Sequence, residues 1–142
     1  MDPEADAREL VRERFPAARA AFLGGGILSE RRTPPERAEL DRRRCGLSDV
    51  LDDLAGSSDP GETAVICWYL LCETAELPLL LDGSWLGGGK WLLRELRAAE
   101  PRLAEELIEA RDDPARLASL AEAVLARAGG RLWAGYRQVG KL

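Results

Sequence analysis

Residues 64–81 read AVICWYLLCETAELPLLL, and this stretch decides the fold. It approaches the roughly 20 apolar residues that a membrane-spanning helix needs. However, Glu73 and Glu76 interrupt it, and Pro78 follows two residues later. Acidic residues near the middle of a span are unfavourable by about 2.5–3.5 kcal/mol each on insertion scales. We therefore expect the central buried helix of a soluble bundle, and no membrane partner.

The flanking sequence predicts further helices. Asp59-Pro60 and Asp113-Pro114 each pair an N-cap acceptor with a proline at the first helical position, and Glu100-Pro101 separates two helices. Apolar residues recur at three- and four-residue steps, which is typical of amphipathic helices. These stripes comprise Leu40, Leu47, Val50, Leu51 and Leu54 between Pro35 and Ala55; Trp91, Leu92 and Leu96; Leu103, Leu107 and Ile108; and Leu117, Leu120, Val124 and Leu125.

The prediction is an all-α helical bundle of about six helices. Its first helix runs from about Pro3 to Arg14. A last short helix carries Leu132, Trp133 and Tyr136 and packs back on the bundle.

Composition excludes several function classes. The 142 residues suit one domain. Histidine is absent, which excludes histidine triads, histidine-ligated zinc and histidine general bases. The net charge of −5 argues against a nucleic-acid partner. Three cysteines and no visible leader segment predict reduced thiols and a cytoplasmic protein. No motif predicts a metal or a cofactor.

Two segments resemble a known family. Residues 18–33, ARAAFLGGGILSERRT, resemble the opening of bacterial nucleotidyltransferase domains related to the kanamycin-type aminoglycoside nucleotidyltransferases. In that family a strand leads into Gly-Gly-Ser, and two aspartates that follow hold metal ions. The segment from Ala38 to Tyr136 looks like the helical C-terminal domain of actinobacterial members. Its motifs include LDRRR from Leu40, LDDL from Leu51, ETAEL from Glu73 and GKWLLR from Gly89.

The sequence departs from the family pattern at positions that matter for catalysis, and our functional expectation follows from these departures. Gly26 replaces the serine, and Pro34-Pro35-Glu36 stands where the Asp-x-Asp strand belongs. The resemblance therefore implies a degenerate member that has lost its catalytic middle. Residues 1–34 would be an N-terminal helix with a remnant entry segment, and residues 35–142 the helical bundle domain. We expect no nucleotidyl transfer.

Glu73 and Glu76 are the first candidate site residues. They stand at i and i+3 on the most apolar helix, where burial raises a carboxylate pKa and suits acid/base chemistry. Lys90 and Arg94 are their expected partners, and Tyr69 could help to orient a small ligand. A structural ion pair or a half-exposed helix face is the alternative.

The remaining candidates are ligand-binding residues. Trp85 and Trp91 flank a glycine loop and could wall an apolar pocket near Glu76 and Lys90, with core packing as the alternative. Arg43 belongs to a run of arginines that could bind a phosphate or carboxylate. The alternative there is a solvated helix face.

Two function classes remain open, and whether the protein is an enzyme is left undecided. The leading hypothesis is a helical module that binds a small molecule or a protein, as a homodimer joined through residues 22–28. The alternative is a cyclase, isomerase or lyase of specialised metabolism that uses a buried glutamate. An active nucleotidyltransferase ranks last. A pocket at the two glutamates would favour the enzyme, and an exposed apolar patch over a filled core would favour the interaction module.

Overall fold

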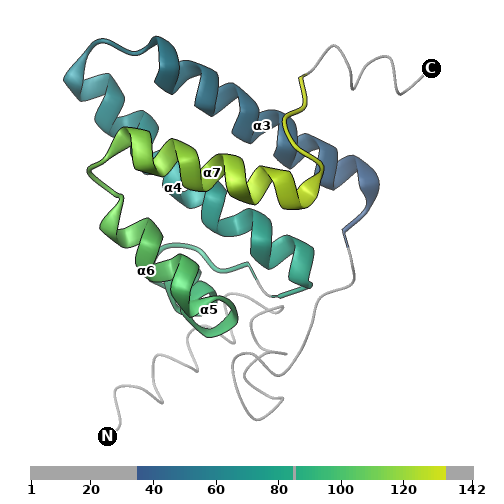
Figure 1. Cartoon of the computed structure of the whole chain (residues 1–142). Coiled ribbons are helices and arrows are strands. Elements are labelled where there is room, and N and C mark those ends of the chain that lie inside the picture. Colours follow the sequence, from purple (N-terminus) through teal and green to yellow (C-terminus); the bar gives the residue numbers. More distant parts are fainter. Residues whose placement is uncertain (1–34, 85, 134–142) are drawn as a thin grey trace, which may run out of the picture.

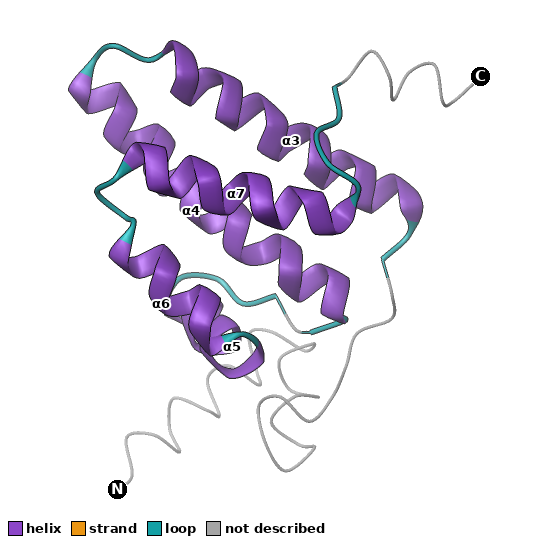
Figure 2. Cartoon of the chain, in the orientation of Figure 1, coloured by secondary structure: helices purple, strands orange, loops and turns teal. Residues whose placement is uncertain are grey.

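The computed structural model describes residues 35–84 and 86–133, and within these two ranges every regular element is an α-helix (Figure 1 and Figure 2). The predicted all-α bundle is confirmed. The predicted helix from Pro3 to Arg14 and the remnant entry segment lie outside the described residues. The helices are α3 (Arg37–Gly56), α4 (Pro60–Asp82), α5 (Lys90–Ala99), α6 (Pro101–Glu109) and α7 (Pro114–Ala128).

Local signals set the helix ends. The Asp59 side chain accepts a hydrogen bond from the Glu62 amide at 2.8 Å, and Asp113 accepts one from the Arg116 amide at 3.2 Å. Both are N-caps followed by proline, as the sequence predicts. Gly83 and Gly129 terminate α4 and α7 in the left-handed conformation, with φ of 72° and 115°.

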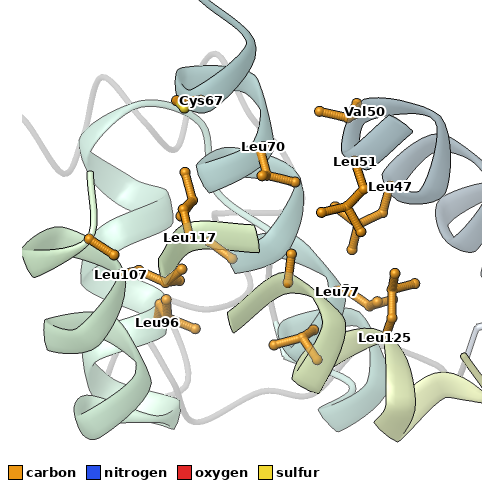
Figure 3. Packing of buried hydrophobic residues seen from close by; sticks show 14 of the residues in the cluster. Leu47, Val50, Leu51, Cys67, Leu70, Leu77, Leu96, Leu107, Leu117 and Leu125 are labelled. Carbon is orange, nitrogen blue, oxygen red and sulfur yellow. The ribbon is translucent and has the colours of Figure 1, made fainter. Parts of the chain in front are cut away.

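Helix α4 is the centre of the bundle. It packs against α3 and α7, which also contact each other, and against the hairpin formed by α5 and α6 (Figure 1). Each of the five helices contributes leucines to one continuous core (Figure 3). The labelled leucines that are at most 3% exposed are Leu47, Leu51, Leu70, Leu77, Leu96, Leu107, Leu117 and Leu125.

Helix α4 is the central helix that we expected, but it is buried on one side only. This helix is long and apolar enough to span a membrane, with a mean hydropathy of 1.6, but only 44% of the apolar stretch is buried in the bundle. Val65 and Trp68 are each 69% exposed, and Tyr69 is 55% exposed. Helix α4 is therefore a core helix on one side and an exposed apolar surface on the other.

Pro78 does not interrupt α4. The helix continues through Pro78, which is buried, to Asp82. The preceding turn at Thr74 and Ala75 stays helical and buried. The proline still lacks the amide that would bond to the Thr74 carbonyl, and the buried Thr74 hydroxyl has no hydrogen-bond partner either.

The segment after α7 returns to α3. The Arg44 guanidinium donates to the carbonyls of Gly129 and Gly130, at 3.0 Å each, and the Leu132 amide donates to the Ser48 hydroxyl at 3.0 Å. Leu132 is buried and packs back as predicted, but Leu132 and Trp133 are not helical. The backbone donors and carbonyls here bond to α3 side chains instead.

Candidate functional site

Glu76 forms an ion pair across the α3–α4 contact, but not with the predicted partners. Its carboxylate pairs with the Arg43 guanidinium, and both side chains are about 30% exposed. We expected Lys90 or Arg94 in this role, and that pairing is wrong. Arg43 stands 33 residues earlier in the chain and reaches Glu76 because α3 and α4 lie side by side. Arg43 therefore neutralises a glutamate of its own chain.

Glu73 lies against α3 one turn away from this ion pair. A Cβ atom on Gly46 would stand 3.3 Å from the Glu73 Oε2 atom, so the glycine makes room for the carboxylate. Burial raises the pKa of Glu73. An interaction with the Tyr69 hydroxyl lowers it, the Glu76 charge raises it, and the Arg43 charge lowers it. Sequence analysis missed Gly46, although a glycine inside a predicted helix is a recognisable signal of close approach.

Tyr69 and Cys72 complete this group, which we call the Glu73 cluster: Arg43, Tyr69, Cys72, Glu73 and Glu76. The Glu73 charge raises the pKa of Tyr69, and burial followed by the two glutamates raises the pKa of Cys72. Neither group is therefore activated as a nucleophile. The cluster is suited to receiving a hydrogen-bond donor or a cation. Among the described residues no group of three or more Cys, Asp or Glu side chains is placed to hold a metal ion.

The Glu73–Gly46 contact makes a testable prediction. We expect Gly46→Ala to stabilise the protein by about 1 kcal/mol, since alanine favours the helix and the end of a glutamate side chain can move aside. The displaced carboxylate should become more solvated, so the pKa of Glu73 should fall. Urea unfolding and an NMR titration of the carboxyl carbons measure the two effects. Gly56→Ala, where no atom lies within 4 Å, should leave the pKa of Glu73 unchanged. A destabilised Gly46→Ala protein would show that the Glu73 carboxylate is fixed in place.

Lys90, Trp91 and Arg94 form a separate group at the start of α5. The Lys90 ammonium lies 5.7 Å, and the Arg94 guanidinium 4.9 Å, from the Trp91 ring centroid. These are cation–π distances. Within the described ranges no ion pair joins either cation to Glu73 or Glu76. Trp85 lies outside the described residues, so the predicted aromatic pocket stays a prediction.

A cavity of about 440 Å³ lies at another place, between α3 and the segment after α7. Its lining includes Leu40, Arg44, Arg131 and Trp133, and none of the predicted site residues. The Arg44 guanidinium donates to backbone carbonyls. The Arg131 guanidinium donates to the carboxylates of Asp52 and Glu122. This cavity therefore offers little unpaired positive charge to an anion.

Glu95 is a buried carboxylate that sequence analysis missed. Glu95 is 1% exposed to solvent, and neither of its carboxylate oxygens has a hydrogen-bond partner. Burial raises the pKa of Glu95 to about 7. The signal was present in the sequence, because Glu95 stands three residues after Leu92 on the apolar face of α5.

Comparison with known proteins found no similarity: no family model matches the chain, and neither a curated protein nor a solved structure matches it. The resemblance to nucleotidyltransferases therefore stays a prediction. Of the two segments that carry it, residues 18–33 lie outside the described residues, and the second segment spans the helices α3 to α7.

Proposed function

We propose that this chain is a protein-interaction module that does not transfer nucleotides. The exposed side of α4 supports this proposal. Val65, Trp68 and Tyr69 are adjacent on that side and more than half exposed, over a core filled by leucines. Exposed apolar patches of this kind mark interaction sites, and tryptophan and tyrosine are enriched among the residues that contribute most to binding energy.

The cavity that the described residues line favours an interaction module over an enzyme. An acid/base enzyme needs a pocket that converges on its carboxylates. The 440 Å³ cavity is lined by neither Glu73 nor Glu76. Arg43 already pairs with Glu76, and the thiol of Cys72 has a raised pKa. The raised pKa values of Glu73 and Glu95 are observations that favour the enzyme alternative.

A selection from a library of displayed helical peptides tests the proposal on the full chain. We expect enriched peptides to bind the wild-type protein and to lose at least tenfold in affinity for Trp68→Ser, because the tryptophan supplies a large part of the exposed apolar surface. Surface plasmon resonance measures both affinities.

The control is Trp133→Ser, which changes another exposed tryptophan, in the segment after α7. This variant should bind the selected peptides like the wild type. Peptides that lose affinity for Trp133→Ser but not for Trp68→Ser would place binding elsewhere and contradict the proposal. Failure to enrich any peptide would contradict it as well.

A further inference from the structure

Acidic side chains border the exposed apolar face of α4 at both ends. Val65, Trp68 and Tyr69 form this face. Glu62 is exposed in the first turn of the helix, before the face, and Glu73 follows it. The two glutamates are 73 − 62 = 11 residues apart, which corresponds to about 16 Å along a helix. The face is therefore an apolar strip of about three turns between two carboxylates.

The side of the strip next to α3 is acidic too. The Arg43–Glu76 ion pair and the close approach of Glu73 to Gly46 show the register of α3 against α4. Asp53 follows Gly46 by seven residues, two turns along the same side of α3, and is exposed. Glu73 and Asp53 have no ion pair with any residue in the described ranges. This border therefore carries an excess of negative charge after Arg43 has neutralised Glu76.

From this arrangement we propose that the partner contributes a basic amphipathic helix. Its apolar side would cover Trp68 and Tyr69, and its lysine or arginine residues would lie against Glu62 and Glu73. This inference rests on the proposed function, since it names the partner of the same face. The strip follows one helix axis at three- and four-residue spacing, which suits a helix packed along it.

Charge complementarity distinguishes this partner from a second copy of the chain. A second copy would bring the same acidic border against Glu73, in a chain with a net charge of −5. Covering the half-buried Glu73 carboxylate without a cation would desolvate it further, which is unfavourable. A guanidinium or ammonium group would add charge-assisted hydrogen bonds to the one that Glu73 already accepts from the Tyr69 hydroxyl.

Four synthetic helical peptides test the charge requirement on the full chain. The first carries leucines at three- and four-residue spacing between two arginines that are eleven residues apart, matching Glu62 and Glu73. The second has glutamates in place of the arginines, the third has glutamines, and the fourth has the leucines scrambled. We expect the arginine peptide to bind at least tenfold more tightly than the glutamate peptide, with glutamine between them and the scrambled peptide not binding. Calorimetry at low and high salt measures this, and high salt should reduce the difference.

Two variants identify the groups involved. Glu73→Gln should weaken the binding of the arginine peptide several-fold and leave the binding of the glutamine peptide unchanged. Asp112→Asn, on the exposed turn after α6, should change the affinity for neither peptide. Equal binding of the arginine and glutamate peptides would overturn the inference. If peptides selected on the same face are not basic, the proposed function stands and the basic partner is wrong.

Two further experiments test the other possible occupants of this face, which are a second copy of the chain and a lipid surface. Sedimentation velocity that shows a wild-type dimer and a Trp68→Ser monomer would assign the face to a second copy and overturn the inference. Flotation of the wild-type protein, but not of Trp68→Ser, with phosphatidylcholine–phosphatidylserine vesicles would assign it to a lipid surface, with the same consequence. We expect neither result.

Discussion

Replacing Glu95 with leucine is expected to stabilise the protein at pH 8 by about 3 kcal/mol. The pKa of Glu95 is raised from 4.5 to about 7, and each unit of difference between the folded and unfolded pKa contributes about 1.4 kcal/mol. Above pH 7 the folded wild-type protein carries this carboxylate ionised and without a hydrogen bond, at 1% exposure. Leucine removes that unfavourable charge and adds apolar contacts with the core.

The direction of the pH dependence follows from the proton balance. Below pH 4.5 both the folded and the unfolded chain hold the Glu95 proton, so this residue causes no loss of stability. Between pH 4.5 and pH 7 the unfolded chain releases its proton first, so the free energy of unfolding falls as the pH rises. Above pH 7 the loss is complete and constant. Glu73 has a raised pKa as well and contributes with the same sign.

Urea unfolding at several pH values between 4 and 8 measures this effect. Glu95→Gln should flatten the decrease of stability with pH, and Glu95→Leu should flatten it and raise the stability further. Glu105→Gln removes an exposed carboxylate from α6 and should keep the wild-type slope. Identical slopes for the wild type and Glu95→Gln would show that Glu95 is ionised in the folded protein at low pH.

Leu77→Ala is expected to destabilise the protein by about 2–5 kcal/mol. Leu77 is 1% exposed and lies in the core that all five helices share (Figure 3). Removing most of a packed leucine loses its transfer free energy and leaves a cavity. Val65→Ala, on the same helix, should change the stability by no more than about 0.5 kcal/mol, because Val65 is 69% exposed.

Denaturant unfolding of both variants, with the full chain, measures this contrast. A loss at Val65 comparable to that at Leu77 would show that the face of α4 is already covered in the free protein. It would also contradict the proposed function, since a covered face cannot receive a partner.

The helix ends were predictable because their signals are local. Asp59 and Asp113 cap the helices that follow them, and Pro101 begins α6. A cap bond joins residues three apart, so a short window of sequence contains both groups. For the same reason, the order of helices in the described ranges and the all-α class follow from spacing and capping alone.

The exposed side of α4 was not predictable from apolar periodicity. Apolar residues surround this helix almost completely, so no stripe shows which side faces the core. We expected a central buried helix, yet Trp68 and Tyr69 on this helix are largely exposed. The sides that α3 and α7 cover depend on long-range packing, which a local window does not contain.

The partner of Glu76 was not predictable for a related reason. Nearness in sequence and suitable charge favoured Lys90 and Arg94, whereas Arg43 lies opposite Glu76 in the antiparallel α3–α4 pair. A loop of only three residues, 57–59, joins these helices. Pairing residues outward from that loop places position 43 opposite position 73, which is within one helical turn of Glu76. The sequence identified the two glutamates as candidate site residues. Predicting their neighbours requires the register of α3 against α4.

The return of the chain to α3 after α7 has a consequence for folding during synthesis. Arg44 bonds to carbonyls 85 and 86 residues later, and Ser48 accepts from an amide 84 residues later. These contacts cannot form until residues 129–132 have left the ribosome. Helix α7 leaves the ribosome shortly before them. Until α7 emerges, the apolar side chains of the α3–α4 hairpin that it covers face solvent. Such transiently exposed surface favours aggregation, so the nascent chain should depend on chaperones most strongly just before α7 emerges.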